Sequence, residues 1–429
     1  MIDINLIRES PEKVKENIKK KFQEAKISLV DDVLKLDKKW RKLKYDEDEL
    51  RSERNKISKK ISEELKKGNK KESEKLKSKA KKIPGEIDNL GAKRKKFEGE
   101  IKKILMKIPN IIHESVSLGK DESENVEVKK IGEPKIPGYE IINHAELAEK
   151  INGVDFENAR KVSGNGFYYL KGDLSKLHSA LINFARDYMV EKGFDFVIPP
   201  FMIRSEVVDG VMSFEEKDNM MYKIEGEDLY LIGTSEHSLI GMFMSKTLNG
   251  KNLPYKITGA SPCFRKEVGA HGIEEKGFYR VHQFEKQEMI VICNPEDSYK
   301  WYNEMLELSL GIFKEIGIPV RVLECCSGDL GDLKAKSADV EAWSPRQKKY
   351  FEVGSCSNLT DAQARRLDIR AEKNGKIYFV HTLNNTVIAS PRVLIALLEN
   401  FQQKDGSVVI PKVLQTYMGG KKKINSKKL

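Results

Sequence analysis

The segment CFRKE, residues 263–267, continues as FYRVHQFEKQE over residues 278–288, and a second motif reads NNTVIASPR over residues 384–392. The second motif runs into the apolar stretch 393–400, which is typical of a buried helix. Guanidinium groups are permanently charged and planar, and their donors match phosphate oxygens. A single Arg–Glu pair is usually a surface ion pair. Two such motifs, each with its own apolar scaffold, indicate a site that holds a polyphosphate beside a small polar substrate.

The composition points to an elongated part attached to a compact body. The chain has 429 residues, enough for two or three domains, with 39% hydrophobic and 33% charged residues. Residues 1–110 sum to a net charge of +13 while the whole chain carries +11, so the remainder sums to −2. A basic module joined to a nearly neutral body indicates a polyanionic partner for that module.

The five cysteines indicate a reducing compartment and no structural zinc. They form no Cys-x-x-Cys pair and show no histidine spacing typical of a zinc site. The first residues lack the long apolar run of a signal peptide, and no stretch approaches the roughly 20 apolar residues of a membrane span. We expect a soluble cytoplasmic protein without membrane contact.

Two highly charged runs, residues 29–67 and 71–108, carry apolar heptads that meet at the turn signal of residues 68–69. If the chain folds back there, positions whose numbers sum to 140 or 141 face each other. This register places Glu47 opposite Arg94, as an ion pair within an apolar seam. The sequence therefore predicts a long antiparallel two-helix arm.

Two features of this arm leave alternatives. The pair Pro84-Gly85 is expected to interrupt the second helix and bend it. Lysines cluster along the arm, and the pattern alone fits either a solvated charged face or a surface that contacts a phosphate backbone.

The body shows short apolar segments bounded by Gly, Pro, Asn and Ser between residues 194 and 380. Few stretches of crossover-helix length separate the middle segments, which favours an antiparallel sheet flanked by helices. The sequence has no internal repeat, no Gly-rich P-loop and no GxGxxG. A nucleotide site must therefore use another architecture.

The motifs together resemble those of the seryl-tRNA synthetases, class II aminoacyl-tRNA synthetases, of the common and not the zinc-dependent type. The resemblance spans nearly the whole chain and includes NIIHESV at 110–116, GTSEH at 233–237 and EVGSCSN at 352–358. It implies an α+β fold: a long antiparallel α-helical coiled-coil arm followed by a class II catalytic domain with a central antiparallel β-sheet flanked by helices. The implied domains are an N-terminal helical domain with a tRNA-binding arm (1–110), the catalytic domain (111–420) and a disordered basic tail (421–429).

The resemblance implies ATP-dependent ligation of L-serine to tRNA(Ser) through a seryl-adenylate. It also implies that the arm grips tRNA(Ser), and that the enzyme is a homodimer through the region from Ser175 to Phe201. The sequence leaves open whether tRNA(Sec) is a second substrate. Two alternatives are an enzyme that adenylates an amino acid for a carrier protein, disfavoured by the full-length basic arm, and a non-catalytic RNA-binding paralogue, disfavoured by the intact motifs.

The family's roles carry over to matching positions. Arg265 and Arg392 are the implied catalytic residues: Arg265 binds the α-phosphate and the serine carboxylate, and Arg392 holds the γ-phosphate of a bent ATP. Glu236 binds the ammonium group, and Glu288 accepts the serine hydroxyl. The implied serine-binding residues are Thr234, Ser235, Glu236, Arg265, Glu288, Asn384 and Thr386. The implied ATP-binding residues are Arg265, Lys266, Glu267, Val281, Phe284, Glu352, Val353, Gly354, Ser355 and Arg392, with Glu352 and Ser355 as Mg²⁺ ligands.

Three histidines near these motifs, His237, His271 and His282, are interpreted as structural residues and not as bases. Adenylation needs no general base, because the carboxylate of serine is already an anion. Lys266 and Gly354 stand where small or hydroxylated residues are expected in relatives.

Overall fold

The computed structural model describes residues 1–267 and 277–426, and the chain divides into two compact units. The helical unit comprises Ile2–Lys19 and Gln23–Pro109. The sheet unit comprises Met1, Lys20–Phe22 and the chain from Asn110 onward. His271 lies outside the described residues.

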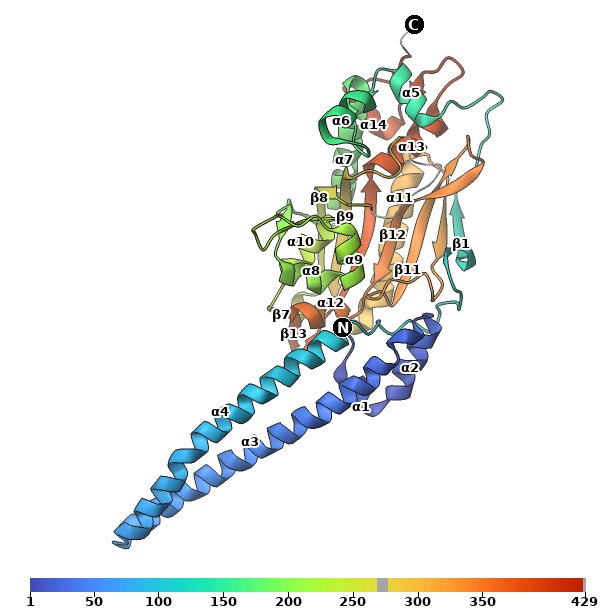
Figure 1. Cartoon of the computed structure of the whole chain (residues 1–429). Helices are drawn as coiled ribbons and strands as arrows, with labels where there is room; N and C mark the ends of the chain where they lie inside the picture. Colours follow the sequence, from blue (N-terminus) through green and yellow to red (C-terminus); the bar gives the residue numbers. More distant parts are fainter. Residues whose placement is uncertain (268–276, 427–429) are drawn as a thin grey trace. The chain divides into compact units, whose positions relative to one another are not determined.

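The helical unit consists of two short helices followed by two long ones. Its elements are α1 (Ile4–Glu9), α2 (Pro11–Lys20), η1 (Glu24–Lys26), α3 (Ser28–Lys66) and α4 (Lys70–Leu105). The long helices α3 and α4 lie side by side and run in opposite directions (Figure 1). Gly68, at the turn between them, has φ of +76°, a conformation that glycine adopts without a steric cost.

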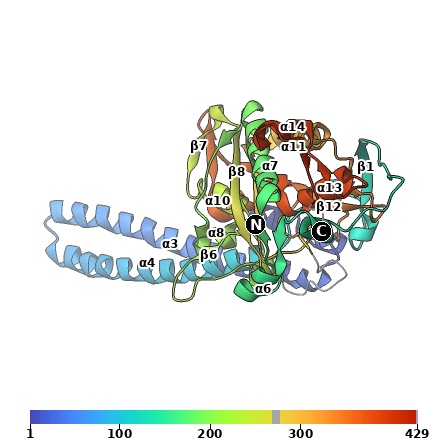
Figure 2. The ribbon, with the colours of Figure 1, turned by 90° about the horizontal axis from the view of Figure 1, so that it is seen from above.

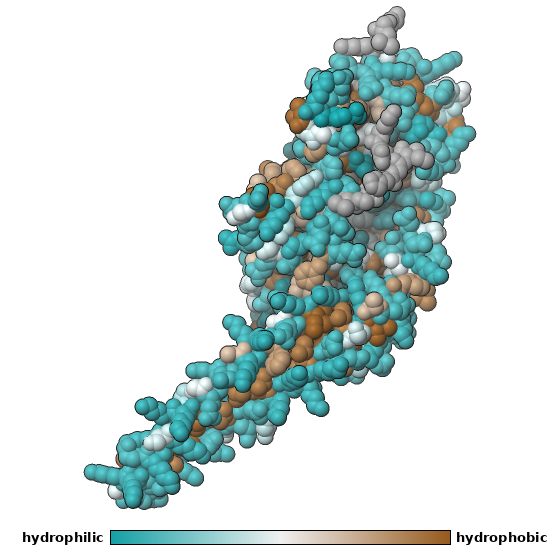
Figure 3. Space-filling model, viewed as in Figure 1, coloured by the Kyte–Doolittle hydropathy of each residue, from teal (hydrophilic) through white to brown (hydrophobic). Residues whose placement is uncertain are grey.

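The predicted register of the arm is confirmed. Arg94 Nε donates to Glu47 Oε2 at 3.0 Å, and Glu47 is 3% exposed. Nearby, Ile57 packs with Ile83 and Ile87 in a buried cluster. In Figure 3 apolar side chains form a narrow line along the otherwise hydrophilic arm. The arm is therefore held by one apolar seam with a polar pair that fixes its register.

The expected interruption at Pro84 is wrong. Helix α4 continues through Pro84 from Lys70 to Leu105. A proline removes one backbone donor, but Ile83 and Ile87 on either side stay packed against α3. This packing offsets the loss of a single hydrogen bond.

The sheet unit is built on an eight-stranded sheet in the order β1-β10-β11-β12-β15-β9-β8-β4. Its strands are β1 (Val126–Ile131), β4 (Asp195–Phe196), β8 (Tyr255–Phe264), β9 (Gln283–Cys293), β10 (Val320–Glu324), β11 (Lys336–Ser344), β12 (Lys349–Asn358) and β15 (His381–Ala389). Every neighbouring pair is antiparallel except the short edge pair β4–β8, which is parallel. The predicted antiparallel sheet is confirmed, apart from this edge.

Helices cover both faces of this sheet. The largest apolar core joins α7 (Gly172–Glu191), α11 (Ser298–Ile316) and α13 (Ser390–Phe401) to one face, where Met289 and Val291 of β9 point. A second core joins α8 (Ser205–Val211), α10 (Ser235–Gly241) and α12 (Ala362–Leu367) to the other face, where Ile290 and Ile292 point. Figure 2 shows α7 and α10 on opposite sides of β8. Alternation along β9 thus separates the two layers.

Smaller elements complete the sheet unit. Three further strands, β7 (Thr247–Asn249), β13 (Arg370–Lys373) and β14 (Lys376–Phe379), form a three-stranded sheet. Two antiparallel pairs are formed by β2 (Val154–Asp155) with β3 (Tyr169–Leu170) and by β5 (Met202–Ile203) with β6 (Tyr230–Leu231). The remaining helical segments are η2 (Glu122–Glu124), α5 (His144–Lys150), α6 (Phe156–Ser163), α9 (Phe214–Met220), η3 (Gly250–Asn252), η4 (Pro295–Asp297), α14 (Lys412–Gln415) and η5 (Thr416–Met418).

The basic segment after residue 420 differs from the expected disordered tail. Lys423–Ile424 form β17, which pairs antiparallel with β16 (Val408–Val409). Ile424 is buried in the main apolar core, and Lys423 Nζ contacts Asp405 Oδ2 at 2.9 Å. One buried isoleucine within a lysine-rich segment is enough to order it locally; residues 427–429 lie outside the described part.

None of the helices in the described residues combines the length and apolar character needed to cross a membrane.

Candidate active site

Strand β9 carries the side chains that form the floor of the site. Its even-numbered residues from 284 to 288 share the face on which Ile290 packs against α10 and α12. The neighbouring strand β15 places Thr386 opposite Glu288 and Asn384 opposite Ile290. Two motifs that lie about 100 residues apart in sequence therefore contribute side chains to one surface.

Arg265 follows β8 and is fixed by backbone contacts. Its amide donates to the His282 carbonyl at 2.9 Å, its Nε donates to the Gly233 carbonyl at 3.1 Å, and its guanidinium lies 5.2 Å from the ring centroid of Phe284. A nitrogen of His282 is 2.9 Å from the Arg265 carbonyl. His282 thus anchors the backbone of Arg265, in agreement with its interpretation as a structural residue.

Arg392 lies in the first turn of α13. Its Nη1 donates to Glu352 Oε2 at 2.7 Å, and its guanidinium lies 4.6 Å from the ring centroid of Tyr279. Burial tends to raise the pKa of Glu352, but the charge and hydrogen bond of Arg392 outweigh burial and the pKa is lowered. Glu352 is therefore ionised at neutral pH and holds Arg392 over the site.

A pocket of about 690 Å³, counted out to the solvent at its mouth, opens between these two arginines. Its lining is Arg265, Glu267, Phe278, Tyr279, Arg280, Val281, Phe284, Lys286, Glu352, Val353, Gly354, Ser355, Thr386, Ala389, Pro391 and Arg392. The pocket brings together every residue predicted to bind ATP except Lys266, whose Nζ points to the Asp218 carbonyl at 3.5 Å.

Glu288 is fully buried and is not part of the pocket lining, but its neighbours Lys286 and Thr386 are. Thr234 donates its hydroxyl to Glu288 Oε1 at 2.7 Å, and Lys286 forms an ion pair with the same oxygen. The other oxygen, Oε2, is buried and has no hydrogen-bond partner in the part of the chain that the structure describes. A buried carboxylate oxygen without a donor is costly, so this atom is a ready acceptor for a hydroxyl group of a ligand.

Glu236 lies in the first turn of α10 and is held by two side-chain amides. Gln363 donates to Oε1 and Asn384 donates to Oε2, both at 2.9 Å. Burial, followed by the charge of Glu288, raises the pKa of Glu236 to about 7. A carboxylate with this environment is stabilised by an incoming cation, such as an ammonium group.

Ser235 of the predicted serine site, and its neighbour His237, have local structural roles. Ser235 donates its hydroxyl to the Gly259 carbonyl at 3.0 Å and is fully buried, so it anchors α10 to β8. Burial, followed by the charge of Arg265, lowers the pKa of His237 to about 3. His237 is therefore neutral, which agrees with a structural role.

The predicted magnesium ligands, Glu352 and Ser355, lie on β12, beside a second carboxylate that the sequence interpretation missed. Ser355 is paired across the sheet with Asp339 of β11. Burial, followed by the charge of Glu352, raises the pKa of Asp339 to about 7. Two carboxylates and a hydroxyl group are hard oxygen donors, which suit Mg²⁺, so the residues present fit this ion.

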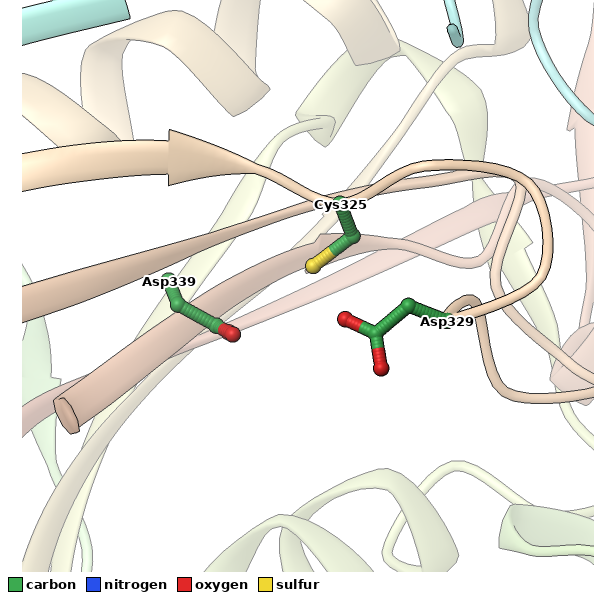
Figure 4. A group of neighbouring side chains, drawn as sticks. All are labelled: Cys325, Asp329 and Asp339. Atoms are coloured by element: carbon green, nitrogen blue, oxygen red, sulfur yellow. The ribbon is translucent and has the colours of Figure 1, made fainter. Parts of the chain in front are cut away.

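Asp339 also belongs to a group of three potential metal-binding side chains. Cys325, Asp329 and Asp339 offer ligand atoms within 4.8 Å of one another, and Figure 4 shows the Cys325 sulfur between the two carboxylates. Burial raises the pKa of the Cys325 thiol, which keeps it protonated, and Asn125 donates to Asp329 Oδ2 at 2.8 Å. A protonated thiol is a poor ligand. Of these three side chains, Asp339 is therefore the one that could bind a metal ion together with Glu352.

Sequence reasoning missed three residues of the site besides Asp339. Lys286 lies in the motif of residues 278–288. Because it alternates with Phe284 and Glu288 along one strand, the sequence could have placed it on the same face as these two residues. Tyr279 precedes β9, and Gln363 lies on α12. Their partners, Arg392 and Glu236, are distant in sequence, so no local pattern marks these contacts.

Known proteins match this chain over nearly its whole length. A profile of the seryl-tRNA synthetase N-terminal domain matches residues 1–112, and one of the class II tRNA synthetase core domain (G, H, P, S and T) matches residues 220–401. The serine–tRNA ligase of Methanocella arvoryzae is 45% identical over 98% of this chain and 99% of its own. That of Pyrococcus horikoshii is 44% identical over 98% and 97%.

Solved structures agree. The crystal structure of seryl-tRNA synthetase from Pyrococcus horikoshii complexed with ATP has a TM-score of 0.93 at 44% identity and covers 100% of both chains. The cytoplasmic serine–tRNA ligase of Naegleria fowleri in complex with AMP has a TM-score of 0.88 at 37% identity, covering 100% of this chain and 99% of its own. The prolyl-tRNA synthetase of Giardia lamblia, at 17% identity and a TM-score of 0.54, shares the fold alone over 63% of this chain and 54% of its own.

Proposed function

This chain belongs to the seryl-tRNA synthetase family, and on this premise we propose that it ligates L-serine to tRNA(Ser) with ATP. The serine carboxylate attacks the α-phosphorus of ATP and releases pyrophosphate. A hydroxyl group of the terminal ribose of the tRNA then attacks the carbonyl carbon of the seryl-adenylate, and AMP leaves. The two alternative functions are not favoured, because the alignment with serine–tRNA ligases includes the helical unit as well as the site. Serine-dependent ATP–pyrophosphate exchange, combined with tRNA charging, tests the proposal.

The arginine pair supports ATP binding and adenylation. Arg265 would contact both the α-phosphate and the serine carboxylate, and Arg392 would hold the γ-phosphate. Both arginines line the pocket, Arg265 just after β8 and Arg392 in the first turn of α13. Phe284 offers a face on which adenine can stack. Preorganised charges of this kind stabilise the transition state for phosphoryl substitution, and no residue is needed as a general base.

Mg²⁺ is part of the same proposal, held by Glu352 and Ser355 with Asp339 nearby. When bound, it would neutralise phosphate charge and that of the pyrophosphate leaving group.

The observation that carries the choice of serine is the unpartnered oxygen of Glu288. A serine hydroxyl would donate to Oε2 while Oε1 keeps its bonds to Thr234 and Lys286. Alanine would leave this oxygen buried and unpaired. A site that forms a hydrogen bond with a substrate group discriminates strongly against analogues without that group.

Replacing Glu288 by alanine should therefore relax the preference for serine over alanine by about 10²-fold or more, while the KM for ATP changes far less. The measurement is kcat/KM for both amino acids in pyrophosphate exchange. Glu288→Gln is the matched control, since its amide keeps the shape and can still bond the hydroxyl. An unchanged serine/alanine ratio in Glu288→Ala would show that another group reads the hydroxyl.

Serine use should also depend on pH through Glu236. Its pKa of about 7 means that the carboxylate loses its charge, and so its affinity for the ammonium group, as pH falls below neutrality. We expect kcat/KM for serine to fall on the acid side of pH 7, with the KM for ATP nearly constant. In Glu236→Gln this acid limb should vanish; a limb that persists there would assign the titration to another group.

A homodimer is proposed through the region from Ser175 to Phe201. Large apolar side chains are exposed in and just after it: Val190 (48%), Phe196 (36%), Ile198 (72%), Phe201 (38%) and Met202 (49%). An apolar surface of this kind is typical of an interface. Sedimentation of the full chain at several concentrations tests it.

A cytoplasmic location belongs to the same proposal, and charging assays with tRNA(Sec) decide whether that RNA is a second substrate.

The arm is proposed to bind tRNA(Ser). The exposed lysines of α3 and α4 give it a positive surface, and a cluster of its apolar residues is packed in the seam between the helices. A surface of this type suits an RNA helix, which proteins contact mainly through its backbone and shape.

A further inference from the structure

Gln363 lies outside the pocket lining and touches the one carboxylate proposed to bind the ammonium group. It is fully buried on α12, and its Nε2 donates to Glu236 Oε1 at 2.9 Å and to the Val211 carbonyl at 3.2 Å. The Val211 carbonyl can only accept a hydrogen bond, and so can Glu236 when it is ionised. The amide group must therefore face them with its nitrogen, because the flipped orientation would bring its oxygen against two other oxygens.

Thr382 fixes the other end of this amide. Its hydroxyl donates to Gln363 Oε1 at 2.7 Å, and Thr382 is itself fully buried in β15. Backbone bonds hold it on both sides: its amide donates to the Thr360 carbonyl at 2.9 Å, and the Leu359 amide donates to its carbonyl at 3.1 Å. The Thr382 hydroxyl is therefore held by a rigid strand. It fixes the amide of Gln363, which in turn donates to the carboxylate of Glu236.

We propose that Gln363 and Thr382 form a positioning pair that aims the Glu236 carboxylate at the ammonium group of the amino-acid substrate. The pair acts through Glu236 and touches no reacting atom. This inference rests on the proposed role of Glu236 in serine binding. Asn384 bonds the second oxygen of Glu236 from the opposite side, so the carboxylate is held at both ends.

The pair also matters for the charge of Glu236. Burial and the charge of Glu288 raise its pKa, whereas the hydrogen bond from Gln363 and the charges of Lys286 and Lys334 lower it. Without the hydrogen bond from Gln363, burial and the charge of Glu288 should raise the pKa of Glu236 further. The acid limb of serine use should then move to higher pH, which a residue that merely fills the core would not cause.

The test compares two pairs of variants in serine-dependent pyrophosphate exchange. Gln363→Met keeps the approximate volume and removes the donor, and we expect it to raise the KM for serine by about tenfold or more, the effect of one hydrogen bond to a charged group. The KM for ATP and kcat should change little. Gln363→Glu is isosteric and places a second carboxyl group beside Glu236, so it should move the acid limb to higher pH even if Gln363→Met folds poorly.

Thr382→Val removes only the hydroxyl and should raise the KM for serine in the same direction by a smaller factor. Thr382→Ser keeps the hydroxyl and should remain close to the parent. The inference is overturned if Gln363→Glu and Thr382→Val leave both the KM for serine and the pH profile unchanged, or if the KM for ATP rises equally. A parent chain without serine-dependent exchange would instead overturn the proposed function itself.

Discussion

Arg265→Ala should reduce serine-dependent pyrophosphate exchange by about 10³-fold or more, because one guanidinium serves both reacting groups. Its position between the Gly233 carbonyl and the Phe284 ring is already fixed without ligands. The charge is therefore preorganised and needs no rearrangement when the α-phosphate and the carboxylate approach. Its removal takes away electrostatic stabilisation and also the contact that keeps two anions together.

The fold should survive this change. Arg265 makes one side-chain hydrogen bond to a carbonyl and one cation–π contact, which together contribute about 1–2 kcal/mol to the free energy of unfolding. Circular dichroism and thermal unfolding of the variant check this point.

A matched control is Arg370→Ala on β13. This arginine is 44% exposed and pairs with Asp368 at 2.7 Å, so its removal should leave exchange unchanged. If Arg265→Ala keeps exchange within about tenfold of the parent, Arg265 cannot have the double role assigned to it.

The parts of the fold that could be predicted are those with a repeating local signal. The arm follows from mirrored heptads, and its register could be read to the level of the Glu47–Arg94 pair because folding back at residues 68–69 brings these two positions opposite each other. The face of β9 that carries Phe284 and Glu288 follows from simple alternation. The implied ATP residues cluster because their motifs lie on strands and a helix that meet at one pocket.

The parts that could not be predicted depend on contacts between distant elements. Gln363 bonds Glu236 across 127 residues, and Asp339 meets Ser355 only because β11 pairs with β12. No local pattern distinguishes these side chains from ordinary polar residues. The continuous helix at Pro84 is a similar case, because tertiary packing overrides the local preference.

The second large effect is expected from removing the arm. The structure suggests a truncation that retains Leu43 and Glu98 and replaces residues 44–97 by a short Gly/Ser linker. Positions 43 and 98 face each other across the hairpin, because their numbers sum to 141, as do those of the paired Glu47 and Arg94. This truncation removes Glu47 and Arg94 together and leaves no buried charge without its partner. It also keeps Asp37, which is 1% exposed and accepts from Arg8 Nη2 at 2.6 Å.

The truncated chain should adenylate serine at close to the parental rate, since every residue proposed for the site lies in the sheet unit. Charging of tRNA(Ser) should fall by about 10²-fold or more, because the phosphate contacts of the arm are lost. Raising salt should weaken charging by the full chain steeply and charging by the truncated chain only slightly, since fewer counterions are released. Serine identity of the tRNA would then depend on a helix that the arm recognises by shape and backbone. Equal charging by both chains, with equal salt dependence, would reduce the arm to a structural appendage.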